Sequence, residues 1–290
     1  MAKKAPEKPE QPSGLLDEHE REQAEEHSSI RALVIHEVLR EEGEQELKRP
    51  AGALAWSGLA AGMSLGFSFL SLSLVRSMLP DAPWARLVDS FGYTIGFLVV
   101  ILGRQALFTE STLTAVLPIL VRRDRRTLIA TLRFWAIVLS CNLIGTYVFA
   151  GLISIPRTFS VEVQHSLLAT AKAAMAEPFW PTMIKAVLAG WMIAVMVWLL
   201  PSAQTAKMLV IILLTYIVGI GQFSHVIAGS VESAYAVFVG AATVRAYLYG
   251  FLLPTLLGNV IGGVAMVAIL NHAPLAVELE GAESHETFRK

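Results

Sequence analysis

The chain contains apolar stretches long enough to cross a lipid bilayer, and two of them are interrupted by polar residues. A helix needs about 20 residues to span the hydrocarbon core. Uninterrupted runs cover residues 51–75, 128–155, 186–200 and 247–270, and interrupted runs cover 91–121 and 208–240. Lipid offers no hydrogen-bond partners, so a helix that breaks at membrane depth must face protein or a water-filled path. We therefore predict an all-α membrane protein with six transmembrane helices, two of them broken.

The composition supports a membrane protein and gives no sign of an enzyme. Hydrophobic residues make up 54% and charged residues 16% of the 290 residues, and the net charge is −1. The single cysteine, Cys141, allows neither a disulfide nor a metal cluster. His36 and Glu37 begin a zinc-protease pattern, but Arg40 stands where the second histidine is needed. No Walker-type loop or G-x-S-x-G motif occurs, so we expect no catalysis, no metal, no cofactor and no nucleic-acid partner.

The charged residues divide the chain into three parts. Residues 1–50 form a polar cytoplasmic segment, 51–270 the channel domain and 271–290 a cytoplasmic tail. The first part lacks the apolar core of a signal peptide. Its predicted helix, from about residue 17 to 47, has a narrow apolar stripe that consists of Leu33, Val34, Val38 and Leu39. This stripe either lies on the membrane surface or covers the cytoplasmic mouth of the protein.

Basic residues in the short loops predict the orientation in a bacterial-type inner (plasma) membrane. Short cytoplasmic loops carry an excess of Lys and Arg. The densest basic cluster is Arg122, Arg123, Arg125 and Arg126, and Lys48, Arg49 and Lys207 fall on the same side if six spans are counted. Both termini are therefore expected in the cytoplasm.

Two halves of the membrane region carry matching sequence marks. Asn142-Leu143-Ile144-Gly145 lies in the third predicted span, and Asn259-Val260-Ile261-Gly262 lies in the sixth. Asn142 follows Thr109 by 33 residues, and Asn259 follows His225 by 34 residues. Three spans per half make the repeat inverted. Broken helices at corresponding positions of two halves point to a binding site near the midplane, and the ends of half-helices suit small anions.

Two groups of residues near the breaks are candidates for the pore. His225 can donate and accept hydrogen bonds and titrates near physiological pH, and ionisable groups at membrane depth usually mark a pathway. The alternative is a histidine that only holds two helices together. Leu107 and Phe108 are expected to form an apolar constriction, with Thr109 offering its hydroxyl to the permeant or to His225. Phe223 and Val218 are candidates for a second constriction, and ordinary packing is the alternative for all of these residues.

Three further charges lie near the breaks: Arg104, Glu110 and Glu232. An ion pair between Arg104 and one of the glutamates would make these charges tolerable at membrane depth. The alternative is a direct role in selectivity.

These motifs together resemble the formate/nitrite transporter family. The matching elements are Leu107-Phe108-Thr109, Ser224-His225, the two Asn-x-Ile-Gly segments and Gly258 to Gly263, and the resemblance covers 51–270. The segment from Leu107 to Pro118 looks closer to a less-characterised branch. The resemblance implies an aquaporin-like six-helix fold and a homopentamer with one pore per subunit. It also implies that the family's central histidine is His225, its loop threonine Thr109 and its lysine Lys172.

The resemblance implies permeants that are small monovalent anions or their acids, such as formate, nitrite, acetate or hydrosulfide. The sequence departs from the family at four positions, where Ala106 and Ser224 replace acidic residues and Gly190 and Gly229 replace asparagines. Our hypothesis is a channel in which the anion takes a proton by way of His225. The alternatives are an aquaporin-like channel for neutral solutes and a non-transporting membrane sensor or scaffold.

Overall fold

The computed structural model describes residues 32–265, and all regular structure in this part of the chain is helical. The described residues belong to one compact unit. The first half contains α2 (Ala32–Lys48), α3 (Ala51–Ser77), α4 (Ala85–Leu102), α5 (Phe108–Thr114), α6 (Leu117–Arg122) and α7 (Arg125–Ile153). The second half contains α8 (Val161–Ala174), α9 (Phe179–Ala203), η1 (Gln204–Ala206), α10 (Lys207–Ile220), α11 (Ala228–Phe238), η2 (Ala246–Leu252) and α12 (Leu253–Ala265). The predicted tail, 271–290, and residues 17–31 of the predicted N-terminal helix lie outside the described range.

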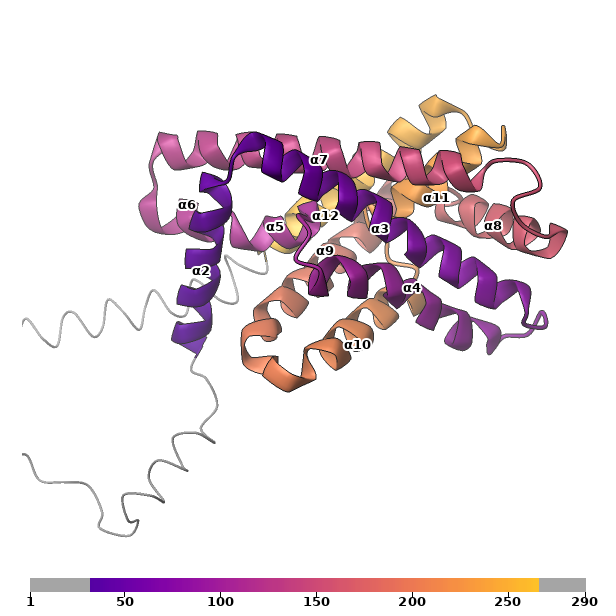
Figure 1. Ribbon diagram of the computed structural model, residues 1–290, viewed down its shortest axis with the longest axis horizontal. Coiled ribbons are helices and arrows are strands. Elements are labelled where there is room, and N and C mark those ends of the chain that lie inside the picture. Colours follow the sequence, from indigo (N-terminus) through magenta and orange to yellow (C-terminus); the bar gives the residue numbers. More distant parts are fainter. Residues whose placement is uncertain (1–31, 266–290) are drawn as a thin grey trace, which may run out of the picture. The chain divides into compact units, whose positions relative to one another are not determined.

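Five helical stretches in residues 32–265 are long and apolar enough to cross a membrane: Ala51–Ser77, Ala85–Leu102, Arg125–Ile153, Phe179–Ile220 and Ala246–Ala265. The stretch Phe179–Ile220 has 42 residues because it joins α9 and α10. The chain reverses between these two helices near Gln204, whose φ of 29° is left-handed. Figure 1 shows α10 returning beside α9, against which it packs. The prediction of a helical membrane protein is therefore confirmed at this level.

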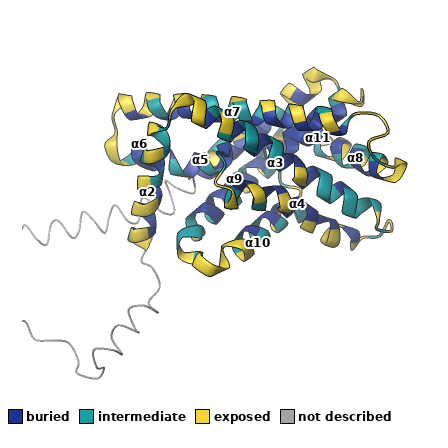
Figure 2. Ribbon diagram, viewed as in Figure 1, coloured by how far each residue is buried: buried dark blue, intermediate teal, exposed yellow. Residues whose placement is uncertain are grey.

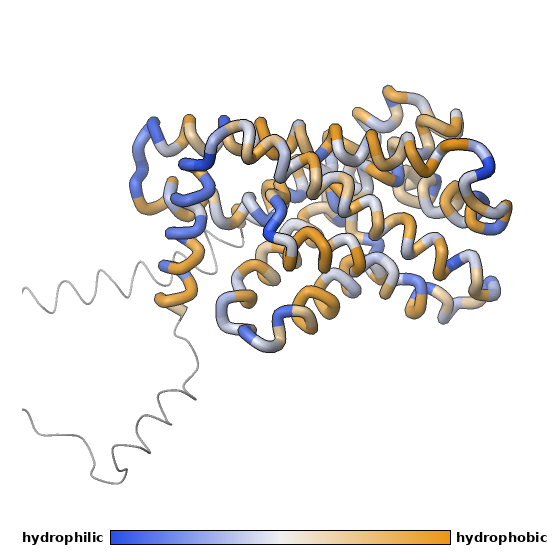
Figure 3. The backbone as a smooth tube through the Cα atoms, in the orientation of Figure 1, coloured by the Kyte–Doolittle hydropathy of each residue, from blue (hydrophilic) through white to orange (hydrophobic). Residues whose placement is uncertain are grey.

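The surface of the bundle is apolar between two polar ends. Large apolar side chains such as Trp56, Ile129 and Leu209 are more than half exposed. Figure 2 shows exposed residues along α7 and α10, and Figure 3 shows that much of this outward surface is hydrophobic. Hydrophilic residues gather instead on α2, in the loop between α6 and α7, and in the loop after α7 (Figure 3). Such a distribution suits a protein whose middle contacts lipid or other apolar surfaces.

The packing of the helices repeats between the two halves. In the first half α3 packs against α4 and α7, and in the second half α9 packs against α10 and α12. The short helices are exchanged: α5 packs against α9 and α12, whereas α11 packs against α3 and α7. The two halves are thus interlocked rather than merely adjacent. This pattern agrees with the duplication that the Asn-x-Ile-Gly segments predict.

Glycines allow the close helix contacts inside each half. A Cβ atom on Gly62 of α3 would lie 2.0 Å from the carbonyl oxygen of Asn142 in α7. A Cβ atom on Gly190 of α9 would lie 2.3 Å from the carbonyl oxygen of Asn259 in α12. Both distances are far below van der Waals contact, so only glycine lets these backbones approach.

The helix α2 packs against one end of the bundle, on α5, α6, α7 and α9. Its predicted apolar stripe is divided, because Leu39 is buried whereas Val34 and Val38 are exposed. Gly43 lies so close to α5 that an added Cβ would stand 2.1 Å from the carbonyl oxygen of Thr114. Ion pairs support this contact (Glu44 with Arg122 at 2.7 Å and Glu42 with Arg104 at 3.3 Å). The sequence left two positions open for this helix, on the membrane surface or over one end of the protein, and these contacts favour the second.

Candidate functional site

The first break is the non-helical segment 103–107 between α4 and α5, and the side chain of Asn142 holds it. The Asn142 Oδ1 atom accepts a hydrogen bond from the backbone N–H of Phe108 at 2.9 Å. Its Nδ2 atom donates to the carbonyl oxygens of Ala106 at 2.9 Å and Gly58 at 2.7 Å. Asn142 is fully buried. The side chain therefore satisfies backbone groups that lipid could not.

The second break, 221–227 between α10 and α11, is held in the same way by Asn259. The Asn259 Oδ1 atom accepts from the backbone N–H of Val226 at 2.8 Å. Its Nδ2 atom donates to the carbonyl oxygens of Ser224 at 2.9 Å and Ala186 at 2.8 Å. The residue between the two held backbone groups is Leu107 in the first break and His225 in the second. These two residues therefore occupy equivalent positions in the two halves.

The ends of α4 and α10 also match. Arg104 and Gln222 both have a left-handed φ of 49°. The next backbone N–H in each case bonds back into the preceding helix, from Gln105 to Val100 and from Phe223 to Val218, both at 3.0 Å. Such a left-handed cap ends a helix sharply while satisfying its last carbonyls.

His225 and Thr109 form the contact between the two breaks. The Oγ1 atom of Thr109 and the Nε2 atom of His225 are 2.8 Å apart, and both residues are at most 1% exposed. The backbone N–H of Ala228 donates to His225 Nδ1 at 3.1 Å. Nδ1 must therefore be the unprotonated nitrogen, and Nε2–H donates to Thr109. The ring of Phe97 lies 5.0 Å away at 81°, in an edge contact. The geometry thus favours a neutral imidazole in one tautomer.

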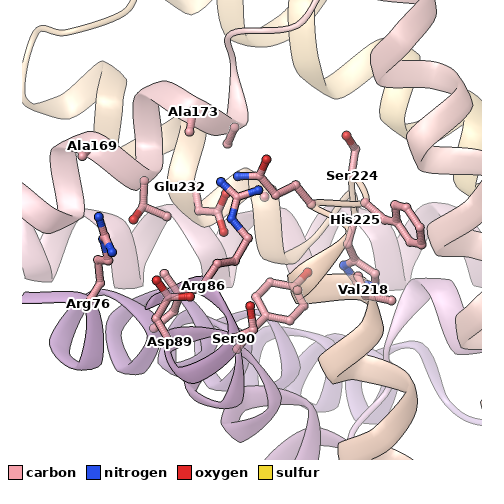
Figure 4. A pocket seen from close by; sticks show the side chains of 18 of the residues that line it. Arg76, Arg86, Asp89, Ser90, Ala169, Ala173, Val218, Ser224, His225 and Glu232 are labelled. Carbon is pink, nitrogen blue, oxygen red and sulfur yellow. The ribbon is translucent and has the colours of Figure 1, made fainter. Parts of the chain in front are cut away.

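A cavity of about 750 Å³ leads from the α8 end of the bundle to His225. We call it the vestibule; its walls come from α3, the α3–α4 loop, α4, α8, the start of α9, the end of α10, the second break, α11 and η2. Figure 4 shows side chains that line it, including His225 and Glu232. The predicted residues Val218, Phe223 and Ser224 line it as well. Basic and acidic side chains both contribute to the lining: Arg76, Asp81, Arg86, Asp89, Glu177 and Lys185.

The vestibule does not include every residue of the predicted pore. Leu107, Phe108 and Thr109 are at most 2% exposed and do not line it. The ring of Phe108 instead packs edge-on against Trp135 of α7, at 5.8 Å. Lys172 is exposed on α8 and also lies outside the lining. The lysine of the vestibule is Lys185, which pairs with Glu177 at 3.0 Å.

The charges near the breaks do not pair as the sequence suggests. Arg104 pairs with Glu42 of α2 rather than with Glu110 or Glu232, because its left-handed turn lies at the exposed end of α4. Glu232 is 9% exposed and lines the vestibule. Within residues 32–265, neither Glu232 nor Glu110 has a hydrogen-bond or ion-pair partner. No local pattern in the sequence indicates that these carboxyl groups remain unpaired.

Comparison with known proteins gives the family. A model of the formate/nitrite transporter family matches residues 33–273. The chain belongs to the formate/nitrite transporter family. The inner membrane protein YfdC of Escherichia coli (strain K12) is 37% identical over 260 residues, which cover 90% of this chain and 84% of YfdC. This membership makes the protein a membrane transport protein.

Solved structures of the formate/nitrite transporter family share the fold. A pentameric formate channel with formate bound aligns with a TM-score of 0.66 and 19% identity, over 83% of this chain and 99% of the channel. An FNT family ion channel aligns with a TM-score of 0.72 and 19% identity, over 84% of this chain and 99% of the other.

Two departures from the formate/nitrite transporter pattern have a steric explanation. Gly190 contacts the backbone of α12 too closely for any side chain, as described above. A Cβ atom on Gly229 would lie 2.2 Å from the ring of Phe251, which η2, a π-helix, carries into the vestibule wall. The asparagines expected at these two positions therefore have no room in this packing.

Proposed function

We propose that the protein is a channel for small monovalent anions or their weak acids, of the formate, nitrite, acetate or hydrosulfide type. The observation that supports it most is the buried contact of 2.8 Å between Thr109 and His225, because His225 lines the vestibule. Family membership and the shared fold of a formate-bound channel point the same way.

The proposal includes six membrane crossings. Four are α3, α7, α9 and α12 with η2, and the other two are α4 with α5 and α10 with α11, each interrupted by a break. The basic loop between α6 and α7 would face the cytoplasm together with α2, by the positive-inside rule. The vestibule would then open to the outside of the inner membrane, and both termini would be cytoplasmic.

We propose a homopentamer with one pore per subunit. The support is the shared fold with a channel that is itself pentameric. Exposed apolar side chains such as Trp56 (74% exposed) would contact lipid or a neighbouring subunit. The number of subunits is a direct measurement for the purified protein by native mass spectrometry.

The anion would enter the vestibule past Arg86, an exposed cation at the start of α4 that would attract it. As it loses water, the anion becomes a stronger base and is more easily protonated. The Thr109 hydroxyl accepts from His225, so its own hydrogen remains available to donate to the permeant. His225 would thus orient Thr109. Proton exchange at His225 itself would first require Nδ1 to lose the bond from Ala228.

Uptake into proteoliposomes tests the proposal. We expect formate, nitrite, acetate or hydrosulfide to enter faster than into protein-free vesicles. Thr109→Val keeps the shape of the side chain but removes the donor, and should lower uptake by roughly tenfold, the value of one hydrogen bond of about 1.4 kcal/mol. His225→Ala should lower it as well.

A matched control is Thr146→Val in α7. Thr146 is also fully buried, but its hydroxyl bonds only the Leu143 carbonyl oxygen of its own helix, at 2.7 Å. Its variant should transport like the parent. Uptake of none of the four anions, or equal uptake by the Thr109 and Thr146 variants, would contradict the proposal. Osmotic swelling in neutral solutes without anion uptake would favour a neutral-solute channel.

A further inference from the structure

Glu232 is the vestibule residue whose surroundings are hardest to explain as packing alone. It lies in α11, seven residues after His225, and lines the same cavity (Figure 4). The side chain is about nine-tenths buried. A buried carboxylate without a partner is strongly disfavoured, so such a group stays protonated or meets a ligand.

Two of the basic groups of the vestibule have partners of their own, one is exposed, and Asp89 of α4 is a second buried carboxyl group in the lining. Arg76, at the end of α3, bonds Asp81 at 2.6 Å, and Lys185 bonds Glu177 at 3.0 Å. Arg86 is exposed at the start of α4. Within residues 32–265 no basic side chain lies within ion-pair distance of Glu232.

The elements packed against α11 are α3, α7, α8 and η2. From α7 and η2, Tyr147 and Tyr247 bond each other at 2.9 Å, and Tyr247 donates to Ser230 at 3.0 Å. From α8, His165 and Lys172 are exposed and do not line the vestibule. The titratable groups that share the vestibule wall with Glu232 are then Arg76 of α3, Arg86, Asp89 and Tyr93 of α4, Asp81, Glu177, Lys185 and His225.

We propose that Glu232 is the proton donor that neutralises the anion inside the vestibule before it reaches the Thr109–His225 pair. This inference rests on the proposed function and deepens it. The O–H bond of the Glu232 carboxyl group breaks, its proton forms a new bond to the anion, and the electron pair stays on Glu232 as a carboxylate. The neutral acid moves on, and the carboxylate is reprotonated by a hydronium ion that reaches it from the bulk solution through the vestibule, which leaves a water molecule.

His225 is poorly suited to this step. Its Nδ1 atom already accepts from Ala228, and its Nε2–H bonds Thr109. A neutral imidazole is far too weak an acid to protonate a carboxylate or nitrite, whereas a carboxylic acid is of comparable strength to these permeants. Glu232 also places a carboxyl group in the vestibule lining, where Ser224 and Gly229 stand at positions at which the family pattern has an acidic residue and an asparagine.

The experiment follows formate uptake into proteoliposomes by stopped flow, over a series of external pH values. Glu232→Gln keeps the size of the side chain but cannot exchange a proton, and Glu232→Asp keeps the carboxyl group. The control is Glu162→Gln, an exposed carboxylate in the first turn of α8 that lies outside the vestibule. All variants are first checked by size-exclusion chromatography for the parent's elution volume.

At neutral external pH we expect Glu232→Gln to lower uptake by roughly a hundredfold, the lower end of what a positioned acid contributes. The loss should shrink as the pH falls, because neutral formic acid then forms in bulk water. Glu232→Asp should keep most of the parent's rate and pH profile, and Glu162→Gln all of it.

Three results would overturn the assignment. If Glu232→Gln loses the same fraction of uptake at every pH, the residue has only a structural role. If uptake by Glu232→Gln equals or exceeds that of the parent, Glu232 is not a donor, and an increase would indicate an ionised group that repels the anion. Both results leave the channel proposal intact, whereas a parent protein without any anion uptake would overturn both proposals.

Discussion

Substituting the asparagine that holds the first break tests the account of the fold most directly. Asn142→Ala removes three hydrogen bonds, to Phe108, Ala106 and Gly58. The Gly58 carbonyl lies inside α3, where it also faces the helix's own N–H groups. The Phe108 N–H and the Ala106 carbonyl have no partner within a helix, so the substitution leaves both without a hydrogen bond in a buried site.

The cost follows from these two groups. A buried polar group without a partner costs about 1–3 kcal/mol, so the substitution should destabilise the protein by about 4 kcal/mol. For a domain of this size, 1 kcal/mol lowers the melting temperature by about 2–4 °C, so we expect a drop of about 10 °C. Asn259 makes the same three kinds of bond in the second half, so Asn259→Ala should cost about as much.

Thermal unfolding in detergent, followed by the loss of the size-exclusion peak, measures this drop. The matched control is Thr146→Val, one turn further along α7, which removes a hydroxyl bonded only within its own helix. Its melting temperature should change by less than a third as much. If Asn142→Ala melts within a degree or two of the control, the asparagine does not hold the break.

Two further results are expected. Gly190→Ala should destabilise the protein by about 1–3 kcal/mol, because the added Cβ would meet the Asn259 carbonyl. The control, Gly52→Ala, places its Cβ in open space and should be neutral or slightly stabilising. The same melting assay measures both variants. Burial raises the pKa of Glu44, but the hydrogen bond from Arg122 and the charges of Arg122, Arg40 and Lys48 together outweigh it, so this pKa lies below its ordinary value of 4.5. The stabilisation of α2 by this carboxylate is then complete above pH 4.5 and is lost as the pH falls further. Hydrogen exchange of the backbone amides across Ala32–Lys48 should therefore accelerate on acidification. The acceleration should be smaller in Arg122→Gln, which already lacks the ion pair.

The sequence predicted the local features of the fold well. Long apolar runs predict the helices, and the polar interruptions from Gly103 to Thr112 and near His225 contain the non-helical segments, although α5 already begins at Phe108. The repeated asparagines were recognisable as a pattern because they recur in equivalent surroundings. The Thr109–His225 contact could be proposed because both residues are polar in otherwise apolar spans.

Other features depend on contacts between distant parts of the chain. The partner of Arg104 is Glu42, and no local pattern places α2 beside the end of α4. Lys185 rather than Lys172 reaches the vestibule, because α8 turns Lys172 outward. The steric role of Gly190 becomes visible only when α12 is seen to lie against α9.

The exchange of α5 and α11 between the halves has a consequence for biogenesis. The helix α5 packs against α9 and α12, which the ribosome makes much later. The first half can therefore enter the membrane, but α5 then has only its contacts with α7 and its other first-half neighbours, and it lacks its larger contacts with α9 and α12 until nearly the whole chain has been synthesised. By the same reasoning, each half produced alone lacks the helices of the other half on which its short helix packs. We therefore expect the two halves to assemble when they are co-expressed as separate chains, and each half to be unstable when it is expressed alone.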